Sequence, residues 1–456
     1  MRFTRSVLAG CLLVATAVGS APAGSAPRRA APSVLGIGLM ASTDVRGLGG
    51  WMPRSGVPWT YAYRYLGGGA LRPSKNWTGW APKGSYPIRY AQTAESHRYV
   101  PVFTYYQMLA GPTSCPGCGE ARRDLANLNS PAAMRAYYAD FALLMKRLGP
   151  GTHDGVRGYG KDVIVHLEPD LSGYAQMAAL RPATNCFGFC SKAGNDPSNV
   201  RASVRSSGFA GALRYPDTYR GFNQVILRLR DTYGPNVRLG LHTSNWTTGY
   251  DINSSKDGTL DAAALGRRAG AFAAASGARW TDGSHSTYDL VFNDVSNKDA
   301  GYYKNVLRKD RFWDQDNRTF PNFHRWEAYL KAVTTTTGRK AFVWQVPIGN
   351  QHYRSQNNTA GHYQDNRVEY FFGHMRELRA AGVAAVLFGT TIPQATNYAD
   401  WAKDGTTNPL RTCSRDGWSS GRTVCSTRVA TSPDDDGGFL RLLAGNYYKA
   451  PLPLPG

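Results

Sequence analysis

Eight short apolar runs recur along the chain, and most of them are nearly continuous in apolar and aromatic residues. The runs are 34–40, 59–66, 99–106, 162–168, 237–243, 289–294, 341–347 and 384–390. Continuous runs of this kind are typical of strands in a parallel sheet that is covered on its outer face. The pattern therefore predicts eight buried strands.

Segments with helical spacing separate these runs. Residues 131–148 have Ser130 as a potential N-cap and Pro131 in the first turn. Glycines stand where C-caps would be, at Gly149, Gly338 and Gly382. The predicted helices are 131–148, 218–233, 260–276, 322–336, 366–381 and 437–447.

Strands that alternate with helices predict an α/β fold, a TIM-like (β/α)8 barrel, with a single domain over residues 34–456. A doubly wound sheet is the alternative. It is disfavoured because no Gly-x-Gly-x-x-Gly follows an early strand. The longest segments follow strands, at 107–130, 169–215, 295–320, 348–365 and 391–436. In a barrel these are loops of the C-terminal face, where active sites lie.

The N-terminus has the pattern of a secretory signal. A short basic segment precedes an apolar one, and Ala21-Pro22-Ala23 offers a cleavage site. We predict a signal peptide over 1–23, a flexible lead-in over 24–33 and an extracellular protein. A lipoprotein attached through Cys11 is the alternative, since Leu8-Ala9-Gly10-Cys11 resembles a lipobox. No other stretch reaches the ~20 apolar residues that a transmembrane helix needs.

Removal of this signal leaves six cysteines in three close pairs. An even number in an exported chain predicts disulfides rather than metal or redox sites. Local pairing is the simplest of the possible connectivities, and it would staple the long loops. The pairs are Cys115/Cys118, Cys186/Cys190 and Cys413/Cys425.

The fourth predicted strand ends in two carboxylates, within HLEPD. Strand alternation directs Ile164, His166 and Glu168 toward the barrel interior. Asp170 shares this parity, and Pro169 ends the ladder. Repulsion between two close carboxylates raises the pKa of one of them. Such a group can remain protonated near neutral pH and act as a general acid. A structural role in capping or in an Arg pair is the alternative.

The sixth predicted strand ends in Asn293-Asp294, which offers a second carboxylate. Both parities of this strand mix apolar and polar residues, so the pattern leaves open which of the two faces inward. Hydrogen-bonding and aromatic side chains follow the other strands and could line a site for a polyhydroxylated ligand. The predicted substrate-binding residues are Tyr105, Gln107, Tyr174, His242, Asn245, Trp246, Asn293, Trp344, Gln345 and Asn350.

The formal net charge of +21 first suggests nucleic acid. However, the basic residues are spread along the chain without a block, so we expect no nucleic-acid partner and consider an acidic polymer instead. The chain has no His-Glu-x-x-His, no P-loop and no cluster of His and Cys. We therefore expect no metal and no cofactor, and a monomer.

An exported barrel with carboxylates at strand ends and aromatic loops resembles the (β/α)8-barrel glycoside hydrolases. VIVHLEPD looks like the strand ending in Glu-Pro-Asp of family-six cellulases, and the pairing of Glu168 or Asp170 with Asp294 resembles the alpha-galactosidase type of barrel. The resemblance implies hydrolysis of an extracellular polysaccharide, with Glu168 as general acid and Asp294, or Asp170, as nucleophile or base. The alternatives are a non-catalytic carbohydrate- or cell-wall-binding barrel, and a lyase or transferase acting on an acidic polymer.

Overall fold

Eight parallel strands close into a barrel in the order β1-β10-β9-β8-β7-β6-β3-β2. They are β1 (Gly36–Met40), β2 (Tyr61–Gly67), β3 (Val100–Tyr106), β6 (Val163–Leu167), β7 (Val237–His242), β8 (Leu290–Asp294), β9 (Ala341–Val346) and β10 (Val383–Phe388). The structure is a computed structural model, which describes residues 33–44, 47–72, 75–112, 117–182, 186, 188–280, 286–351, 358, 361–390, 392, 394–398, 414–415, 423–424 and 437–454.

Each predicted apolar run forms one strand of this barrel, so the strand prediction is confirmed. The barrel is closed because β1 pairs with both β2 and β10, in parallel on each side. A doubly wound sheet would instead leave two free edges, so that alternative is excluded. The predicted signal peptide and almost all of the lead-in lie outside the described residues.

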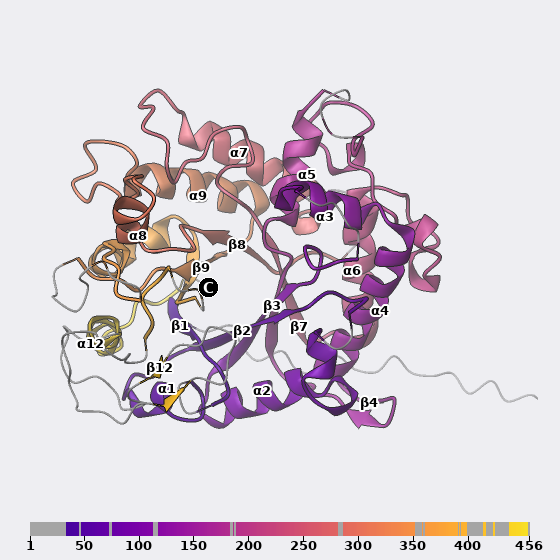
Figure 1. Cartoon of the computed structure of the whole chain (residues 1–456), viewed down its shortest axis with the longest axis horizontal. Coiled ribbons are helices and arrows are strands. Elements are labelled where there is room, and N and C mark those ends of the chain that lie inside the picture. Colours follow the sequence, from indigo (N-terminus) through magenta and orange to yellow (C-terminus); the bar gives the residue numbers. More distant parts are fainter. Residues whose placement is uncertain are drawn as a thin grey trace, which may run out of the picture.

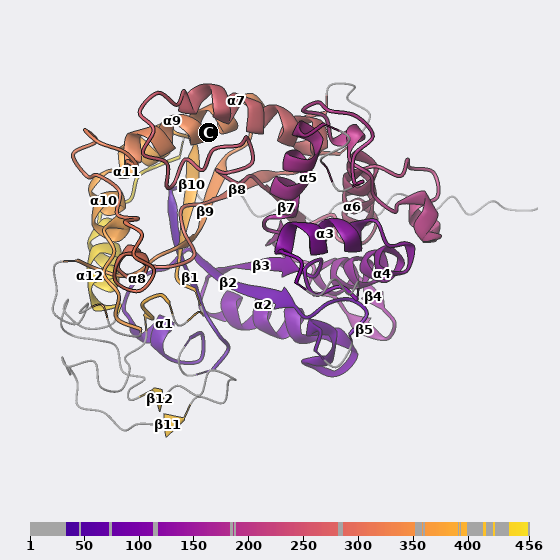
Figure 2. The ribbon, with the colours of Figure 1, turned by 45° about the horizontal axis from the view of Figure 1, so that its top comes forward.

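Helices surround the strands on the outside (Figures 1 and 2). They are α1 (Trp51–Arg54), α2 (Tyr86–Ser96), α3 (Glu120–Leu128), α4 (Pro131–Leu148), α5 (Leu171–Leu180), α6 (Tyr219–Tyr233), α7 (Ala262–Ala273), α8 (Ala300–Asn305), α9 (Phe323–Thr337), α10 (Arg367–Gly373), α11 (Met375–Ala380) and α12 (Gly438–Tyr447). Two short antiparallel pairs lie apart from the barrel, β4 (Thr152–His153) with β5 (Val156–Arg157), and β11 (Ser414–Arg415) with β12 (Thr423–Val424).

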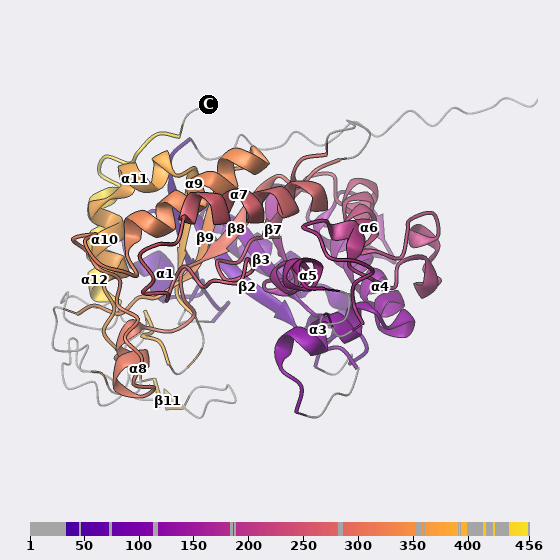
Figure 3. The same ribbon diagram turned by 90° about the horizontal axis from the view of Figure 1, so that it is seen from above.

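Capping side chains fix where the predicted helices begin. Ser130 accepts a hydrogen bond from the backbone of Ala133 at the start of α4, as its sequence position predicts. Asn322 does the same for Arg325 in α9, and Gly338 ends that helix with a φ of 66°. The long segments after β3, β6 and β8 contain the short helices α3, α5 and α8. Of these, α3 and α8 extend from the same side of the barrel (Figure 3).

The helix predicted over 366–381 is interrupted, which corrects that prediction. It consists of α10 and α11, which are separated by His374 with φ −126° and ψ 29°. The His374 ring nitrogen Nδ1 lies 2.8 Å from the Tyr370 carbonyl oxygen. The His374 backbone N–H donates to Phe371 instead. The imidazole thus occupies the acceptor that a continuous helix would use, and the chain turns there.

Two apolar clusters form the core, one inside the barrel and one between strands and helices. Along β6, Ile164 belongs to the inner cluster, whereas Val163 and Val165 belong to the outer one, as the alternation predicts. Inside the barrel, the ring of Phe292 stacks on His166 with centroids 4.0 Å apart. Gly240 on β7 makes room for this ring, because a Cβ there would lie 2.2 Å from it.

One predicted disulfide, Cys186–Cys190, is present, with a Cα–Cα distance of 5.9 Å. Cys118 is also disulfide-bonded. The other cysteines of the predicted pairs, Cys115, Cys413 and Cys425, lie outside the described residues. Within the part of the chain that the structure describes, no helix has the length and hydrophobicity to cross a membrane.

Candidate active site

A pocket of about 290 Å³ lies over the C-terminal ends of β6, β7, β8 and β9. This is the face at which the barrel fold places active sites. Its lining combines acids, aromatic rings, amides and two arginines. The lining residues are Glu120, Asp170, Tyr174, Trp246, Asn253, Asp294, Val295, Ser296, Asn297, Tyr303, Arg311, Trp344, Gln345 and Arg367.

Asp170 enters this pocket from the start of α5. Its backbone has a φ of 71°, which is unusual for a residue with a side chain, and its carboxylate caps no helix N–H. Burial, and then the negative charges of Asp294 and Glu120, raise the pKa of Asp170 to about 7, while His242 opposes this. Asp170 is therefore a carboxyl group that is half protonated near neutral pH and open to a ligand.

Asp294 reaches the same pocket from the end of β8, and the structure decides the question of parity that the sequence leaves open. Asn293 points outward, where its amide oxygen accepts a hydrogen bond of 3.0 Å from the indole N–H of Trp326 on α9. Asp294 consequently faces the barrel mouth, with its side chain 21% exposed. Asn245 donates to the backbone carbonyl of Asp294 and accepts from Asn293, so it fixes the end of this strand.

Two buried histidines form the floor beneath these acids. The ring nitrogens of His166 and His242 lie 3.0 Å apart, and His242 Nε2 lies 3.5 Å from Asp294 Oδ1. Burial lowers the pKa of His166, so that imidazole is neutral at physiological pH. Trp344 packs edge-on against both rings, at 4.9 and 5.8 Å. The floor thus places the His242 ring directly behind Asp294, although no hydrogen bond joins Nε2 to Oδ1.

Glu168 lies elsewhere, although the sequence predicts that it shares the inward face of Ile164 and His166. A φ of 37° at Glu168 ends the alternation of β6. Its two carboxylate oxygens accept hydrogen bonds from the backbone N–H groups of Gln107 and Met108, at 3.0 and 3.2 Å. Tyr137 of α4 is a neighbour on the outer side.

Glu168 is only 2% exposed and does not line the pocket. Burial raises its pKa to about 8 despite the two backbone donors. The contacts of Glu168 are therefore structural, because its carboxyl group stabilises the backbone of the segment after β3. Its predicted role as general acid is not supported by any contact with the pocket.

Four of the predicted substrate-binding residues line the pocket: Tyr174, Trp246, Trp344 and Gln345. The rings of Tyr174 and Trp246 pack together at 5.0 Å, so they present one aromatic surface. Gln345 donates to the hydroxyl of Tyr65 at 2.7 Å and also has a positive φ, of 60°. Backbone strain at strand ends that surround a pocket is a common feature of functional sites.

The remaining predicted binding residues are buried and hold the structure together. Tyr105 donates to Asp140 of α4 at 2.7 Å, and Gln107 bonds to backbone and side-chain groups in and after β2. Asn350 is 3% exposed and does not line the pocket. The other three residues surround Asp294: His242 approaches its carboxylate, Asn245 donates to its backbone carbonyl, and Asn293 donates to Asn245.

The sequence predictions do not include several pocket side chains from the segments after β3, β7, β8 and β9, some of them in α3, α8 and α10. Glu120, Asn253, Tyr303, Arg311 and Arg367 all line the pocket. Arg367 is oriented by Asp365, to which it donates at 2.6 Å. These residues lie far from strand ends, so no position rule for barrels singles them out.

Only one group of metal-ligand side chains occurs among the described residues, and it lies outside the pocket, on α9 and α11. The pocket itself is lined by the carboxyl groups of Glu120, Asp170 and Asp294 together with amides, aromatic rings and two arginines.

The chain matches no protein-family model, and no curated protein is similar to it in sequence. Among solved structures, it is similar to the endoglucanase Cel6 from Mycobacterium tuberculosis, with 12% identity, a TM-score of 0.27, and coverage of 62% of this chain and 60% of that chain. The chain thus spans less than two thirds of that enzyme.

Two further solved structures have higher TM-scores. A modular endo-β-1,4-mannanase from Cellulomonas fimi, of glycoside hydrolase family 26, has 10% identity, a TM-score of 0.41, and coverage of 81% of this chain and 68% of that chain. A xylanase-α-amylase inhibitor protein, solved with trehalose, has 12% identity, a TM-score of 0.37, and coverage of 78% of this chain and 92% of that chain.

Proposed function

We propose that the protein is an extracellular glycoside hydrolase that cleaves a polysaccharide with Asp170 and Asp294 as its catalytic carboxyl groups. The observation that carries the proposal is that both acids line one pocket at the barrel mouth, where burial and Asp294 raise the pKa of Asp170 to about 7. Residues 1–23 would direct export.

The two acids would have different roles because their surroundings differ. Asp170, protonated in part at neutral pH, would donate its proton to the glycosidic oxygen as the bond breaks. Asp294 would act as the carboxylate, either as nucleophile or as the base that activates water. His242 lies behind it at 3.5 Å and Asn245 holds its backbone, so its position is fixed before substrate binds.

The aromatic lining supports a sugar ligand. Trp246 and Tyr174 offer a flat surface on one wall, and the edge of Trp344 lies at the floor. Sugar rings present apolar faces that pack on such surfaces, while their hydroxyl groups need the amides of Asn253, Asn297 and Gln345. Arg311, whose side chain is partly exposed, would additionally favour a substrate with acidic groups.

The proposal is tested by measuring the release of reducing ends from a panel of neutral and acidic polysaccharides. We expect product with at least one of them, and at least about 100-fold less product from Asp170→Asn or Asp294→Asn protein that retains the wild-type melting temperature. Mass analysis of the product distinguishes hydrolysis from elimination, because a lyase leaves an unsaturated end.

Binding without any product would overturn the proposal and favour the non-catalytic carbohydrate-binding barrel. Undiminished activity in both Asn variants would show that the reaction takes place elsewhere in the molecule.

A further inference from the structure

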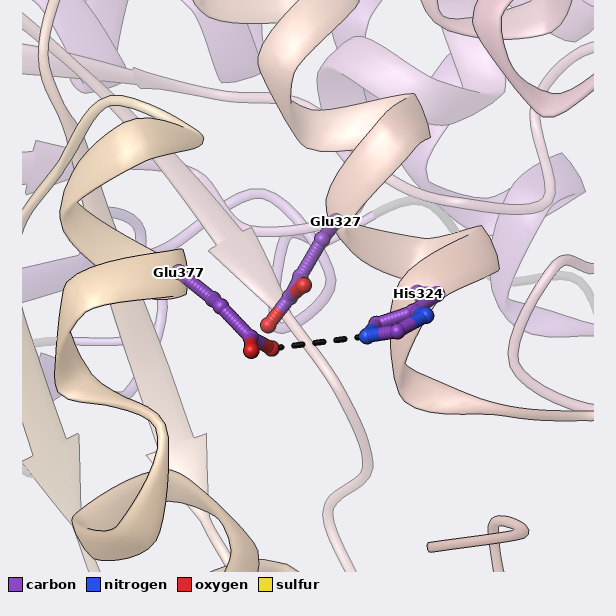
Figure 4. Close-up of side chains that lie close together, drawn as sticks. All are labelled: His324, Glu327 and Glu377. Carbon is purple, nitrogen blue, oxygen red and sulfur yellow. Dashed lines mark ion pairs between the residues drawn. The ribbon is translucent and has the colours of Figure 1, made fainter. Parts of the chain in front are cut away.

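Three side chains of metal-ligand type converge on the outer side of the barrel, away from the pocket. His324 and Glu327 project from successive turns of α9, and Glu377 projects from α11 toward them (Figure 4). One ligand atom from each residue can be chosen such that all three lie within 4.8 Å of one another. Glu327 and Glu377 are far apart in the sequence, so the packing of the two helices creates the cluster.

Glu327 is the feature that points to a ligand. The residue is 9% exposed, and its Oε1 atom is buried with no hydrogen-bond partner. Figure 4 shows its carboxylate pointing into the space between His324 and Glu377. A buried carboxylate oxygen without a partner costs free energy unless a cation or donor satisfies it. Within the described residues, His324 is the one cationic group that pairs with either of the two acids.

The distances suit a small ion with a mixed nitrogen and oxygen shell. His324 Nε2 lies 3.5 Å from Glu377 Oε2. Zinc bonds of about 2.0–2.2 Å in a tetrahedron place neighbouring ligand atoms about 3.4 Å apart. The His324 and Glu377 side chains are 59% and 42% exposed, so solvent can reach the cluster and complete the shell.

A supporting layer orients the Glu377 carboxylate. The Tyr370 hydroxyl donates to Glu377 Oε2 at 3.2 Å and accepts from Asn317 at 3.0 Å. The Tyr370 ring is held between Phe323 and His374, with centroids 3.6 and 3.8 Å away. Such outer contacts fix the ligands of a metal and raise its affinity. They also link α9 to the break between α10 and α11.

We propose that His324, Glu327 and Glu377 bind one divalent transition-metal ion, such as Zn²⁺, which clamps α9 to α11. An imidazole with two carboxylates favours Zn²⁺ over Mg²⁺ and Ca²⁺, because those two ions prefer shells made only of oxygen. This site does not depend on the proposed glycosidase activity.

The test is isothermal titration of EDTA-treated, full-chain protein with ZnCl₂, and separately with MgCl₂ and CaCl₂. We expect one Zn²⁺ per chain, a higher melting temperature with Zn²⁺, and no comparable effect of the other two ions. Glu327→Gln should weaken Zn²⁺ binding by more than about 100-fold, and Tyr370→Phe by about 10-fold. His324→Ala is a second variant that removes a ligand. Because the His324 side chain is exposed, we expect this protein to fold normally.

Glu369→Gln is the matched control, because Glu369 is a partly buried acid on the neighbouring α10 that takes no part in the cluster. It should retain full Zn²⁺ binding. The proposal is overturned if the wild-type protein takes up no Zn²⁺, or if folded Glu327→Gln and His324→Ala proteins bind it as tightly as the wild type.

Discussion

Glu168 and Asp170 are next-nearest neighbours in the sequence, yet they lie in different regions of the molecule. Glu168 lies in the layer between barrel and helices, where backbone N–H groups hold both of its oxygens. Asp170 lies at the barrel mouth and lines the pocket together with Asp294. Burial raises the pKa of both, to about 8 and about 7.

The difference shows that a raised pKa does not by itself identify a catalytic acid. Both carboxyl groups are buried, but only Asp170 lines a pocket that a ligand can enter. A general acid must also contact the atom that it protonates. Glu168 thus has structural contacts, whereas Asp170 has the position that the proposed catalytic role requires, and the following experiments test that difference.

Asp294→Asn should have the largest effect on turnover. The change removes the carboxylate but keeps its size, so we expect a loss of kcat of about 10³-fold or more with little change in melting temperature. Steady-state kinetics on the substrate found by the polysaccharide screen measures it. Retention of more than a tenth of the wild-type kcat would remove Asp294 from the mechanism.

Asp170→Asn should lower kcat by about 10²–10⁴-fold, and the pH profile provides the sharper test. A general acid must carry its proton, so wild-type kcat/KM should fall as the pH rises through about 7. The residual activity of the Asn variant should lack this fall. If the variant keeps the same alkaline limb, another group supplies the proton.

Glu168→Gln should affect stability more than chemistry. One lost hydrogen bond to the segment after β3 should lower the free energy of unfolding by about 1–3 kcal/mol at pH 5, with kcat changed less than about 10-fold. Thermal or urea unfolding measures the first effect, and steady-state kinetics measures the second. An inactive but fully stable variant would reverse the comparison and make Glu168 the catalytic acid.

The pH dependence of stability follows from the same group. The folded pKa of Glu168, about 8, exceeds its ordinary value of 4.5. Its contribution to stability is therefore complete below about pH 4.5 and is lost as the pH rises through about 8. The melting temperature of the wild type should fall over this range more steeply than that of Glu168→Gln. Parallel curves would contradict the burial of this carboxyl group.

Trp246→Ala should have the smallest effect among the variants of the pocket. The ring packs with Tyr174 at a centroid distance of 5.0 Å and lines the pocket. We expect kcat/KM to fall about 10-fold, mainly through KM, because an aromatic surface contributes roughly 0.5–1.5 kcal/mol beyond its buried area. A change confined to kcat would mean that Trp246 positions the reacting groups instead.

Much of the barrel could be predicted from local patterns. Each strand is a continuous apolar run, and the caps at Ser130 and Gly338 lie where the helices begin and end. Helical periodicity does not predict the interruption at His374, because an imidazole that competes for one carbonyl group does not change the spacing of apolar residues.

The candidate site was predictable only in part. The acids at the ends of β6 and β8 follow from the position rule for barrels, and so do Trp246 and Trp344. Gln107 satisfies the same rule, yet it points into the core, where it accepts from the backbone of Gly69. Tyr105 still lies within β3, and the alternation of that strand directs it outward with Phe103, toward Asp140 of α4. Position after a strand does not decide direction once regular alternation has ended.

The sequence by itself determined the class of fold, the strand order along the chain and the set of acids from which a mechanism could be built, because hydrophobic periodicity is a local property. Only the tertiary structure decided the rest. The positive φ of Glu168 turned its carboxylate away from the pocket, and the packing of α11 on α9 brought Glu377 to His324 and Glu327. Such contacts depend on where distant segments meet, which no local pattern records.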